Sequence, residues 1–333
     1  MKEKRFDIIV IGGGHAGLEA AWSASQFQFS IGIFTIPEVS LGSMPCNPAI
    51  GGVGKGQIVR EIDALGGLMG ILADKAAIQY RLLNESKGYA VRSTRVQVDK
   101  KIYSAVAEKL VAENPCIEVV RQKIVHIEKK GSEFKLFTES KQEFKCLKLV
   151  VTAGTFLGGV LHTGDEVAKG GRVSCQASPG MRGLFSSVKT LPVRFKTGTP
   201  PRLDRNSIDF DNLIKQPSRD DVLNFHCLNP AFFRHCPQAV CYLTETNEKT
   251  LKIIRENKEK SPMFNGQIKG VGPRYCPSLE DKAFRYLERN RHHVFLEPEG
   301  LDLPTIYPNG ISTGLPKSIQ EKFVRTIPGL DRA

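Results

Sequence analysis

The sequence predicts an α/β fold in which a Rossmann-type parallel sheet carries a β-rich excursion and an inserted smaller domain. The first observation is an apolar run over 6–11, rich in Ile and Val, with the composition of a buried parallel strand. The second is the order that follows: a glycine cluster, helical spacing over 18–26 and another apolar run over 30–35. The third is a further strand-like run over 145–152, after a β-rich stretch near 117–147. Strand, glycine turn, helix and strand in this order are typical of a dinucleotide-binding unit.

The glycine cluster after the first strand has the spacing of a phosphate-binding turn. Gly12 permits the tight turn, Gly14 lets a pyrophosphate approach the backbone, and Gly17 lets the helix pack on the sheet. One expected feature is missing, because the second strand ends in Thr35 instead of the acidic residue that usually holds a ribose, and Glu38 follows three positions later. A standard NAD dehydrogenase is therefore disfavoured. The complete turn reads Gly12-Gly13-Gly14-His15-Ala16-Gly17.

A second glycine-rich stretch, over 44–56, contains a cysteine. Its glycines let several backbone N–H groups face an anion or a planar ring, and Lys55 adds a positive charge. It is not a Walker A loop, because Ala49 stands where that loop needs glycine and Gly56 stands where it needs Ser or Thr. Cys46 lies just before a helix expected to begin near Gly56, which favours a nucleophile or an acid, although a packing role is the simpler alternative.

The composition changes near residue 200, where helical periodicity fades and Pro and Asn become more frequent. We expect a strand over 239–244 and helices over 279–290 and 316–327. The predicted domains are a nucleotide-binding domain over 1–200, an inserted domain over 201–275 and a return to the first domain over 276–333.

The eight cysteines exclude two kinds of site. No two of them have C-x-x-C spacing, which removes the thioredoxin-like redox pair and the usual zinc knuckle. The one metal-like cluster in the sequence fits no zinc pattern, so we predict no metal site. That cluster comprises His226, Cys227, His235, Cys236 and Cys241.

The charge balance favours a polyanionic partner. The 333 residues include 47 Lys and Arg against 35 Asp and Glu, which leaves a net charge of +12. No apolar run approaches the roughly 18 residues that a membrane span needs. The short apolar stretch near the N-terminus runs into the glycine cluster instead of a cleavage site, so we expect a cytoplasmic protein without a signal peptide.

Several motifs together resemble the MnmG (GidA) family, whose members are tRNA uridine 5-carboxymethylaminomethyl modification enzymes. The resemblance covers essentially the whole chain and begins with the turn at 12–17. It continues through Cys46-Asn47-Pro48-Ala49-Ile50-Gly51-Gly52, Ala64-Leu65-Gly66-Gly67-Leu68-Met69, Lys196-Thr197-Gly198-Thr199-Pro200-Pro201-Arg202, Gly272-Pro273-Arg274-Tyr275-Cys276-Pro277-Ser278-Leu279-Glu280-Asp281-Lys282 and Tyr307-Pro308-Asn309-Gly310-Ile311-Ser312-Thr313.

This resemblance implies an FAD-binding sheet and a flavoenzyme that uses NADH and methylenetetrahydrofolate as the one-carbon donor. It implies that the enzyme works with an MnmE-type GTPase on C5 of the wobble uridine of tRNA, and that the full-length protein is a homodimer. Within the predicted domains, 1–200 would bind FAD and 201–275 would bind nicotinamide. Family members run to roughly twice this length, so we expect a fragment, a truncated reading frame or one part of a split protein.

The resemblance also assigns roles to individual residues. The two motif cysteines, Cys46 and Cys276, would supply a nucleophile and an acid or base, and which does which is left open. A buried thiol before Pro277 is the alternative for Cys276. FAD contacts map to Gly12, Gly13, Gly14, His15, Ala16, Gly17, Val125 and Ser178, and nicotinamide contacts to the stretch that begins with Gly272, Pro273, Arg274 and Tyr275 and includes Glu280, Asp281 and Lys282.

For two of these groups a simpler interpretation stays open. Glu280 and Asp281 also suit the start of a helix, where acids cap the N-terminus. The candidates for the tRNA backbone are each also explained as solvated surface charges. Those candidates are Arg92, Arg95, Lys196 and Arg202.

Three other functions compete with this one. A flavin reductase of the disulfide type is disfavoured because C-x-x-C is absent. A non-catalytic or incomplete nucleotide- and tRNA-binding fragment would bind without turnover. A folate-dependent tRNA-uridine methyltransferase relative is close, but the Cys46 motif and the segment around Cys276 favour MnmG over it.

Overall fold

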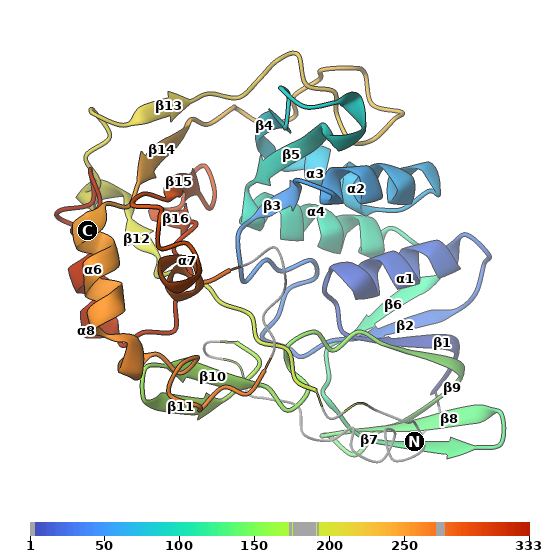
Figure 1. Cartoon of the computed structure of the whole chain (residues 1–333). Coiled ribbons are helices and arrows are strands. Elements are labelled where there is room, and N and C mark those ends of the chain that lie inside the picture. Colours follow the sequence, from blue (N-terminus) through green and yellow to red (C-terminus); the bar gives the residue numbers. More distant parts are fainter. Residues whose placement is uncertain (1–3, 173–174, 176–190, 192, 271–276) are drawn as a thin grey trace. The chain divides into compact units, whose positions relative to one another are not determined.

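The computed structural model of the protein describes residues 4–172, 175, 191, 193–270 and 277–333 (Figure 1). The chain forms two compact units. Unit 1 comprises 1–161, 169–190 and 219–236, and unit 2 comprises 162–168, 191–218 and 237–333.

Unit 1 is built on a six-stranded mixed sheet with the strand order β6-β2-β1-β9-β8-β7. The first four of these strands run parallel, and the β7–β8–β9 meander adds two antiparallel strands at one edge. This arrangement confirms the predicted parallel sheet with a β-rich excursion. The strands are β1 (Lys4–Ile11), β2 (Ile31–Phe34), β6 (Ile117–Val120), β7 (Ile124–Lys130), β8 (Glu133–Thr138) and β9 (Glu143–Val151).

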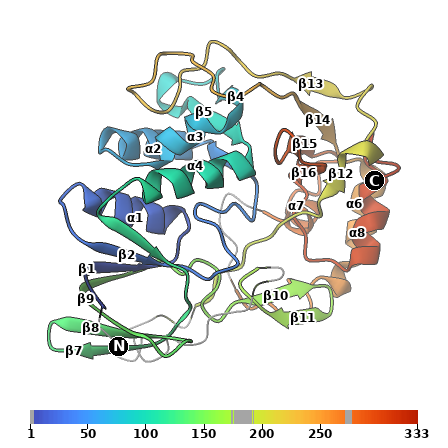
Figure 2. The ribbon, with the colours of Figure 1, turned by 180° about the vertical axis from the view of Figure 1, so that it is seen from behind.

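Helix α1 (His15–Ser25) connects β1 to β2 in the expected way. Figures 1 and 2 show it lying along the parallel strands, and its buried Leu18 and Ala21 belong to the same core as Val10 and Ile33. The core on the other side of the sheet contains Cys146, and burial raises the pKa of this thiol to about 11. The continuous Ile and Val runs in the sequence predict strands of this kind, which are buried on both faces of the sheet.

A three-stranded antiparallel sheet with the order β3-β5-β4 completes unit 1 together with a group of helices. Segment 219–236 packs on these elements without regular secondary structure and contributes Val222 and Phe225 to the core. The elements are β3 (Ala49–Gly51), α2 (Lys55–Ala64), α3 (Met69–Lys75), β4 (Ala77–Leu83), the 3-10 helix η1 (Tyr89–Val91), β5 (Ser93–Val98) and α4 (Lys100–Ala112).

Unit 2 contains a five-stranded antiparallel sheet with the order β12-β16-β15-β14-β13, packed against three helices. Its strands are β12 (Leu203–Asp204), β13 (Ile214–Gln216), β14 (Cys241–Glu245), β15 (His293–Pro298) and β16 (Thr305–Asn309). Its helices are α6 (Glu248–Glu256), α7 (Leu279–Arg285), α8 (Lys317–Val324) and the 3-10 helices η2 (Arg205–Ser207) and η3 (Lys258–Lys260). A separate two-stranded ribbon pairs β10 (Val160–Thr163) with β11 (Glu166–Lys169).

The division into units differs from the predicted domains. Residues 276–333 do not return to the first domain, because β15 and β16 pair with β14 and β12 in the antiparallel sheet of unit 2. Segment 219–236, predicted to lie in the inserted domain, belongs to unit 1. Helix α7 also ends at Arg285, earlier than the predicted Asn290, since the chain turns there and the N–H of Arg289 bonds to the carbonyl of Tyr286.

Across the part of the chain that the structure describes, none of the helices has both the length and the apolar character needed to cross a membrane.

Candidate functional site

The turn after β1 requires glycine at two positions, whereas at a third position there is open space in front of the backbone. Gly12 has φ +111°, and a Cβ there would lie 2.3 Å from the carbonyl oxygen of Thr152. A Cβ at Gly17 would lie 1.8 Å from the carbonyl oxygen of Gly12, so α1 packs directly on the turn. At Gly14 a Cβ would meet nothing within 4 Å. The turn is therefore closed on its inner side and open where a ligand would approach.

The N-terminus of α1 lacks a cap of its own. Gly14 occupies the N-cap position without a side-chain hydrogen bond, and no acidic residue lies in the first turn. Backbone N–H groups and the positive end of the helix dipole are consequently available to an anion. The ring of His15 contacts the hydroxyl of Tyr103 at 3.3 Å, and desolvation lowers the pKa of His15, which favours a neutral ring.

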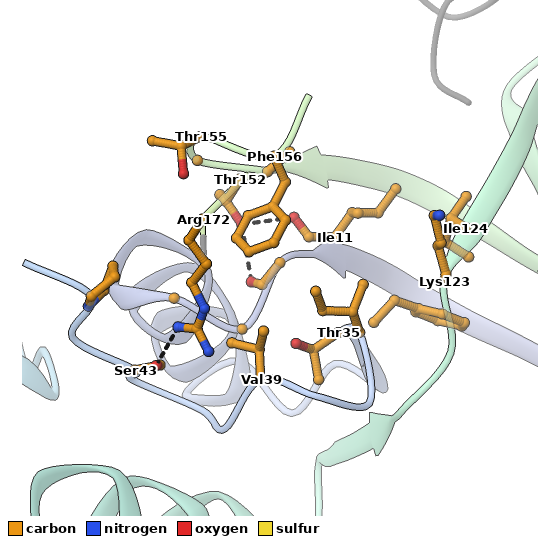
Figure 3. Close-up of a pocket in the computed structure, with 18 of the residues that line it drawn as sticks. Ile11, Thr35, Val39, Ser43, Lys123, Ile124, Thr152, Thr155, Phe156 and Arg172 are labelled. Carbon is orange, nitrogen blue, oxygen red and sulfur yellow. Dashed lines mark hydrogen bonds between the residues drawn. The ribbon is translucent and has the colours of Figure 1, made fainter. Parts of the chain in front are cut away.

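A cavity of about 270 Å³ opens beside this turn, entirely within unit 1 (Figure 3). Its walls come from the turn, from the segment after β2, from the start of β7 and from the turn after β9. The lining residues are Ile11, Gly12, Gly13, Gly14, Phe34, Thr35, Ile36, Val39, Ser43, Pro45, Gln122, Lys123, Ile124, Thr152, Ala153, Gly154, Thr155, Phe156 and Arg172.

The charged side chains that line this cavity are both basic. Figure 3 shows Arg172 directed toward Ser43, and its Nη1 donates to Ser43 Oγ at 2.8 Å. Lys123 lines the cavity from the segment before β7. Thr35 lines it at the end of β2, whereas Glu38 is exposed and is not among the lining residues. The cavity is thus apolar with a cationic contribution, which suits a phosphate-bearing ligand.

The structure places the predicted FAD residues partly around this cavity. Gly12, Gly13 and Gly14 line it, and His15, Ala16 and Gly17 form the first turn of α1 beside it. Val125 lies in β7 next to the lining residue Ile124 and does not itself line the cavity. Ser178 lies outside the described residues.

Sequence reasoning missed Lys123 and Arg172 as residues of this site. The predicted strand over 145–152 ends in a turn at Thr152, whose side chain donates to the carbonyl oxygens of Ile11 and Gly12 at 2.9 and 3.1 Å. That turn was therefore a usable signal. Arg172 follows no motif, and only its long-range contact with Ser43 reveals it.

The second glycine-rich stretch forms an open loop before α2. Gly52 and Gly54 have φ +107° and +72°, and a Cβ at either would meet nothing within 4 Å. Helix α2 begins at Lys55 without a side-chain cap and without an acid in its first turn. Cys46 is exposed and follows Pro45, which lines the cavity. Its proposed partner Cys276 lies outside the described residues.

The predicted nicotinamide residues lie in unit 2, and four of them, Gly272, Pro273, Arg274 and Tyr275, fall outside the described residues. Asp281 forms a capping box with Ser278 at the start of α7, and its carboxylate also pairs with Lys196 at 3.4 Å. Lys282 Nζ donates to the carbonyl oxygen of Gly310 at 2.7 Å. These contacts supply the capping function that was the simpler interpretation for Asp281.

Glu280 has a different role from the expected cap of its own helix. Its side chain is fully buried, and Oε1 accepts hydrogen bonds from Ser261 Oγ, Thr313 Oγ1 and the N–H of Gly314. It therefore ties the loop after β16 to the start of α7.

The four basic residues proposed for tRNA fall into two groups. In unit 2, Lys196 pairs with Asp281, and Arg202 pairs with the buried Glu299 at 3.0 Å and stacks over Tyr307. Both are engaged inside the unit. In unit 1, Arg92 stacks over Tyr89 and Arg95 lies on β5.

A family model described as "Glucose inhibited division protein A" matches residues 7–333. A crystal structure of Aquifex aeolicus GidA, in form I, matches with a TM-score of 0.91 and 43% sequence identity over 99% of this chain and 56% of that chain. A second crystal form of the same protein gives 0.89 and 41% over 99% of this chain and 54% of that one.

The matched region is thus nearly all of this chain but only about half the length of the two GidA chains. The family match and the shared fold confirm the resemblance expected from the motifs. The chain belongs to the glucose inhibited division protein A (GidA) family.

Proposed function

We propose that this chain binds FAD, with the ADP end of the cofactor in the cavity of unit 1, and that it serves a flavoprotein that modifies uridine in tRNA. The observation that carries the proposal is the turn after β1, which is closed at Gly12 and Gly17, open at Gly14 and followed by the uncapped α1. Membership in the GidA family supports the same cofactor and substrate.

The residues around the cavity suit the parts of that ligand. The pyrophosphate would meet the N–H groups at the start of α1, with Arg172 to balance its charge. The ribose would lie near Thr35, whose hydroxyl both donates and accepts, in place of the usual carboxylate. When bound, FAD supplies reversible two-electron redox chemistry.

A basic surface of unit 1 supports tRNA as the substrate. Arg95 on β5 pairs in register with Arg81 on β4 and with Gly51 on β3, which sets two arginines opposite each other beside the open glycine loop. Nearby on the chain, Arg92 stacks over Tyr89, whose side chain is 85% exposed and offers a ring for a base to stack on.

The thiol of Cys46 is the proposed nucleophile or acid of the reaction, with Cys276 in the other role. In the nucleophilic role, a thiolate would add to C6 of uracil, which makes C5 nucleophilic toward a one-carbon donor. Loss of the C5 proton and departure of the thiolate would then restore the ring. Methylenetetrahydrofolate, NADH, an MnmE-type GTPase, a homodimer and a cytoplasmic location belong to the same proposal, which rests on family membership.

The visible absorbance of the purified chain, before and after addition of FAD, tests the proposal. We expect a protein-bound flavin spectrum and tRNA binding that weakens steeply with salt. Flavin binding without turnover, even with tRNA, NADH, the folate and the GTPase supplied, would favour a non-catalytic binding fragment over an enzyme.

The roles of the two thiols are tested in a full-length relative, by changing the cysteines that correspond to Cys46 and Cys276 to alanine. Loss of wobble-uridine modification in these variants supports the roles of the thiols, and normal modification refutes them.

A further inference from the structure

Three side chains with metal-ligating atoms meet in unit 1, away from the residues that line the cavity. Asp63 comes from the C-terminal turn of α2, and His226 and Cys227 come from segment 219–236. Asp63 Oδ1 lies 2.7 Å from His226 Nδ1. The carboxylate oxygen, the imidazole nitrogen and the sulfur all lie within 4.8 Å of one another.

The backbone that carries His226 and Cys227 is held in place by two buried carboxylates. Asp63 Oδ2 accepts the N–H of Cys227 at 2.9 Å, while Asp74 accepts the N–H groups of Phe225 and His226 at 3.0 and 2.8 Å. The side chain of Asp63 is only 2% exposed. Because Oδ2 is engaged by the backbone, Oδ1 is fixed in direction toward His226. Such outer contacts orient the ligands of protein metal sites.

Accessibility differs among the three residues in a way that suits a metal with an open position. Asp63 is buried, His226 is partly buried, and Cys227 is exposed. A metal ion can therefore enter from the side of Cys227, and solvent can supply a fourth ligand there. On the inner side of the three residues, the backbone of Gly70 packs closely against Asp63, since a Cβ at position 70 would lie 2.7 Å from Asp63 Oδ1.

We propose that Asp63, His226 and Cys227 form a binding site for a divalent transition metal of the zinc class, with water as the fourth ligand. Oxygen, nitrogen and thiolate donors together suit zinc and its spectroscopic substitute cobalt(II). A carboxylate and a thiolate together balance the charge of a divalent cation. Binding would release the proton of the Cys227 thiol to solvent, while Nδ1 of His226 would bind as the acceptor nitrogen of a neutral imidazole that carries its proton on Nε2.

The proposal does not depend on FAD binding. The spacing of residues along the sequence does not reveal this three-residue site, because Asp63 is 163 positions from His226. The two residues that are adjacent in sequence, His226 and Cys227, would supply only two ligands by themselves.

Titration with cobalt(II) tests the site. The reduced chain is treated with a chelator, exchanged into metal-free buffer and titrated anaerobically with cobalt(II) alone. We expect thiolate-to-cobalt charge-transfer absorption, tetrahedral d–d absorption that saturates at one equivalent per chain, and displacement of both by zinc. Cys227→Ser should abolish the charge-transfer absorption and weaken cobalt binding by about tenfold or more.

Cys116→Ser is the matched control, because Cys116 in unit 1 is half-buried and still accessible, but its sulfur lies near Gln28 instead of a carboxylate–histidine pair. This variant should keep the full cobalt spectrum. Circular dichroism identifies any variant that fails to fold, and His226→Gln then tests the site through a second ligand. A folded chain without charge-transfer absorption at stoichiometric cobalt, or a spectrum that survives in Cys227→Ser, overturns the proposal.

Discussion

Helix α1 of unit 1 and helix α7 of unit 2 differ in what occupies their N-termini. At α7, Ser278 and Asp281 form a capping box, and Asp281 also pairs with Lys196. At α1, the N-cap is Gly14, which offers no side-chain acceptor and has open space in front of it. A helix that caps itself satisfies its first N–H groups within the protein, whereas an uncapped one leaves them to a ligand. The difference between these two helices supports the proposal that an anion binds at the start of α1.

The largest effect is expected from Gly17→Ala. Its Cβ would lie 1.8 Å from a backbone oxygen that cannot move without deforming the turn. We expect the free energy of unfolding of unit 1 to fall by about 3 kcal/mol, measured by urea denaturation, with loss of FAD binding.

Gly14→Ala is the matched control, because nothing lies within 4 Å of its Cβ and its φ of −76° suits alanine. Stability should change by no more than about 0.5 kcal/mol, while FAD affinity falls because the methyl group projects into the open approach. Equal loss of stability in both variants would break the distinction between the closed and the open side of the turn.

The next effect concerns the charge in the cavity. Arg172→Met should weaken FAD and ADP binding by about 10- to 100-fold, because a charge-assisted hydrogen bond contributes about 1.5–3 kcal/mol. Isothermal titration calorimetry measures the change. Lys109→Gln removes the same charge from an exposed position on α4 and should leave the affinity unaltered. If both variants lose affinity equally, only the overall charge of unit 1 matters.

A smaller effect is expected in unit 2. Asp281→Ala removes the cap of α7 and leaves Lys196, whose side chain is 12% exposed, without this carboxylate. Thermal unfolding should show a loss of about 1–2 kcal/mol, with no change in FAD affinity. A variant that keeps its stability but loses the ability to use NADH would instead support the proposed nicotinamide role of Asp281.

The smallest effect is a pH dependence. Burial lowers the pKa of His15 in the folded state, so the native protein binds fewer protons than the unfolded chain below the ordinary histidine pKa of about 6.5. The stability that depends on a neutral His15 is complete above that value and is lost as pH falls toward and through the lowered pKa. His15→Gln should flatten this part of the stability profile in denaturation at pH 7 and pH 5. An unchanged profile would show that His15 does not control it.

The sequence predicted local features better than distant contacts. The run at 6–11 and the spacing of Gly12, Gly14 and Gly17 defined β1, the turn and α1, because that motif lies within one short segment. The unit boundaries failed because antiparallel pairing brings β12 beside β16, about 100 positions apart, and no periodicity records such a pairing.

The candidate sites show the same limit. The glycines of the cavity were found by their motif, whereas Arg172 enters through a contact with Ser43, 129 positions away. Likewise, Asp63 lies on a helix whose sequence gives no sign of His226. Residues that act through tertiary contacts of this kind leave no local pattern.

Hydrogen–deuterium exchange with and without ADP tests the central claim most directly, since it locates a ligand on the chain by the backbone amides that it protects. We predict slower exchange over 13–17 and 152–156 in unit 1 and no change at the start of α7. Protection at α7 with none over 13–17, or no protection anywhere in a folded chain at saturating ADP, would contradict the assignment of the nucleotide site to the uncapped helix of unit 1.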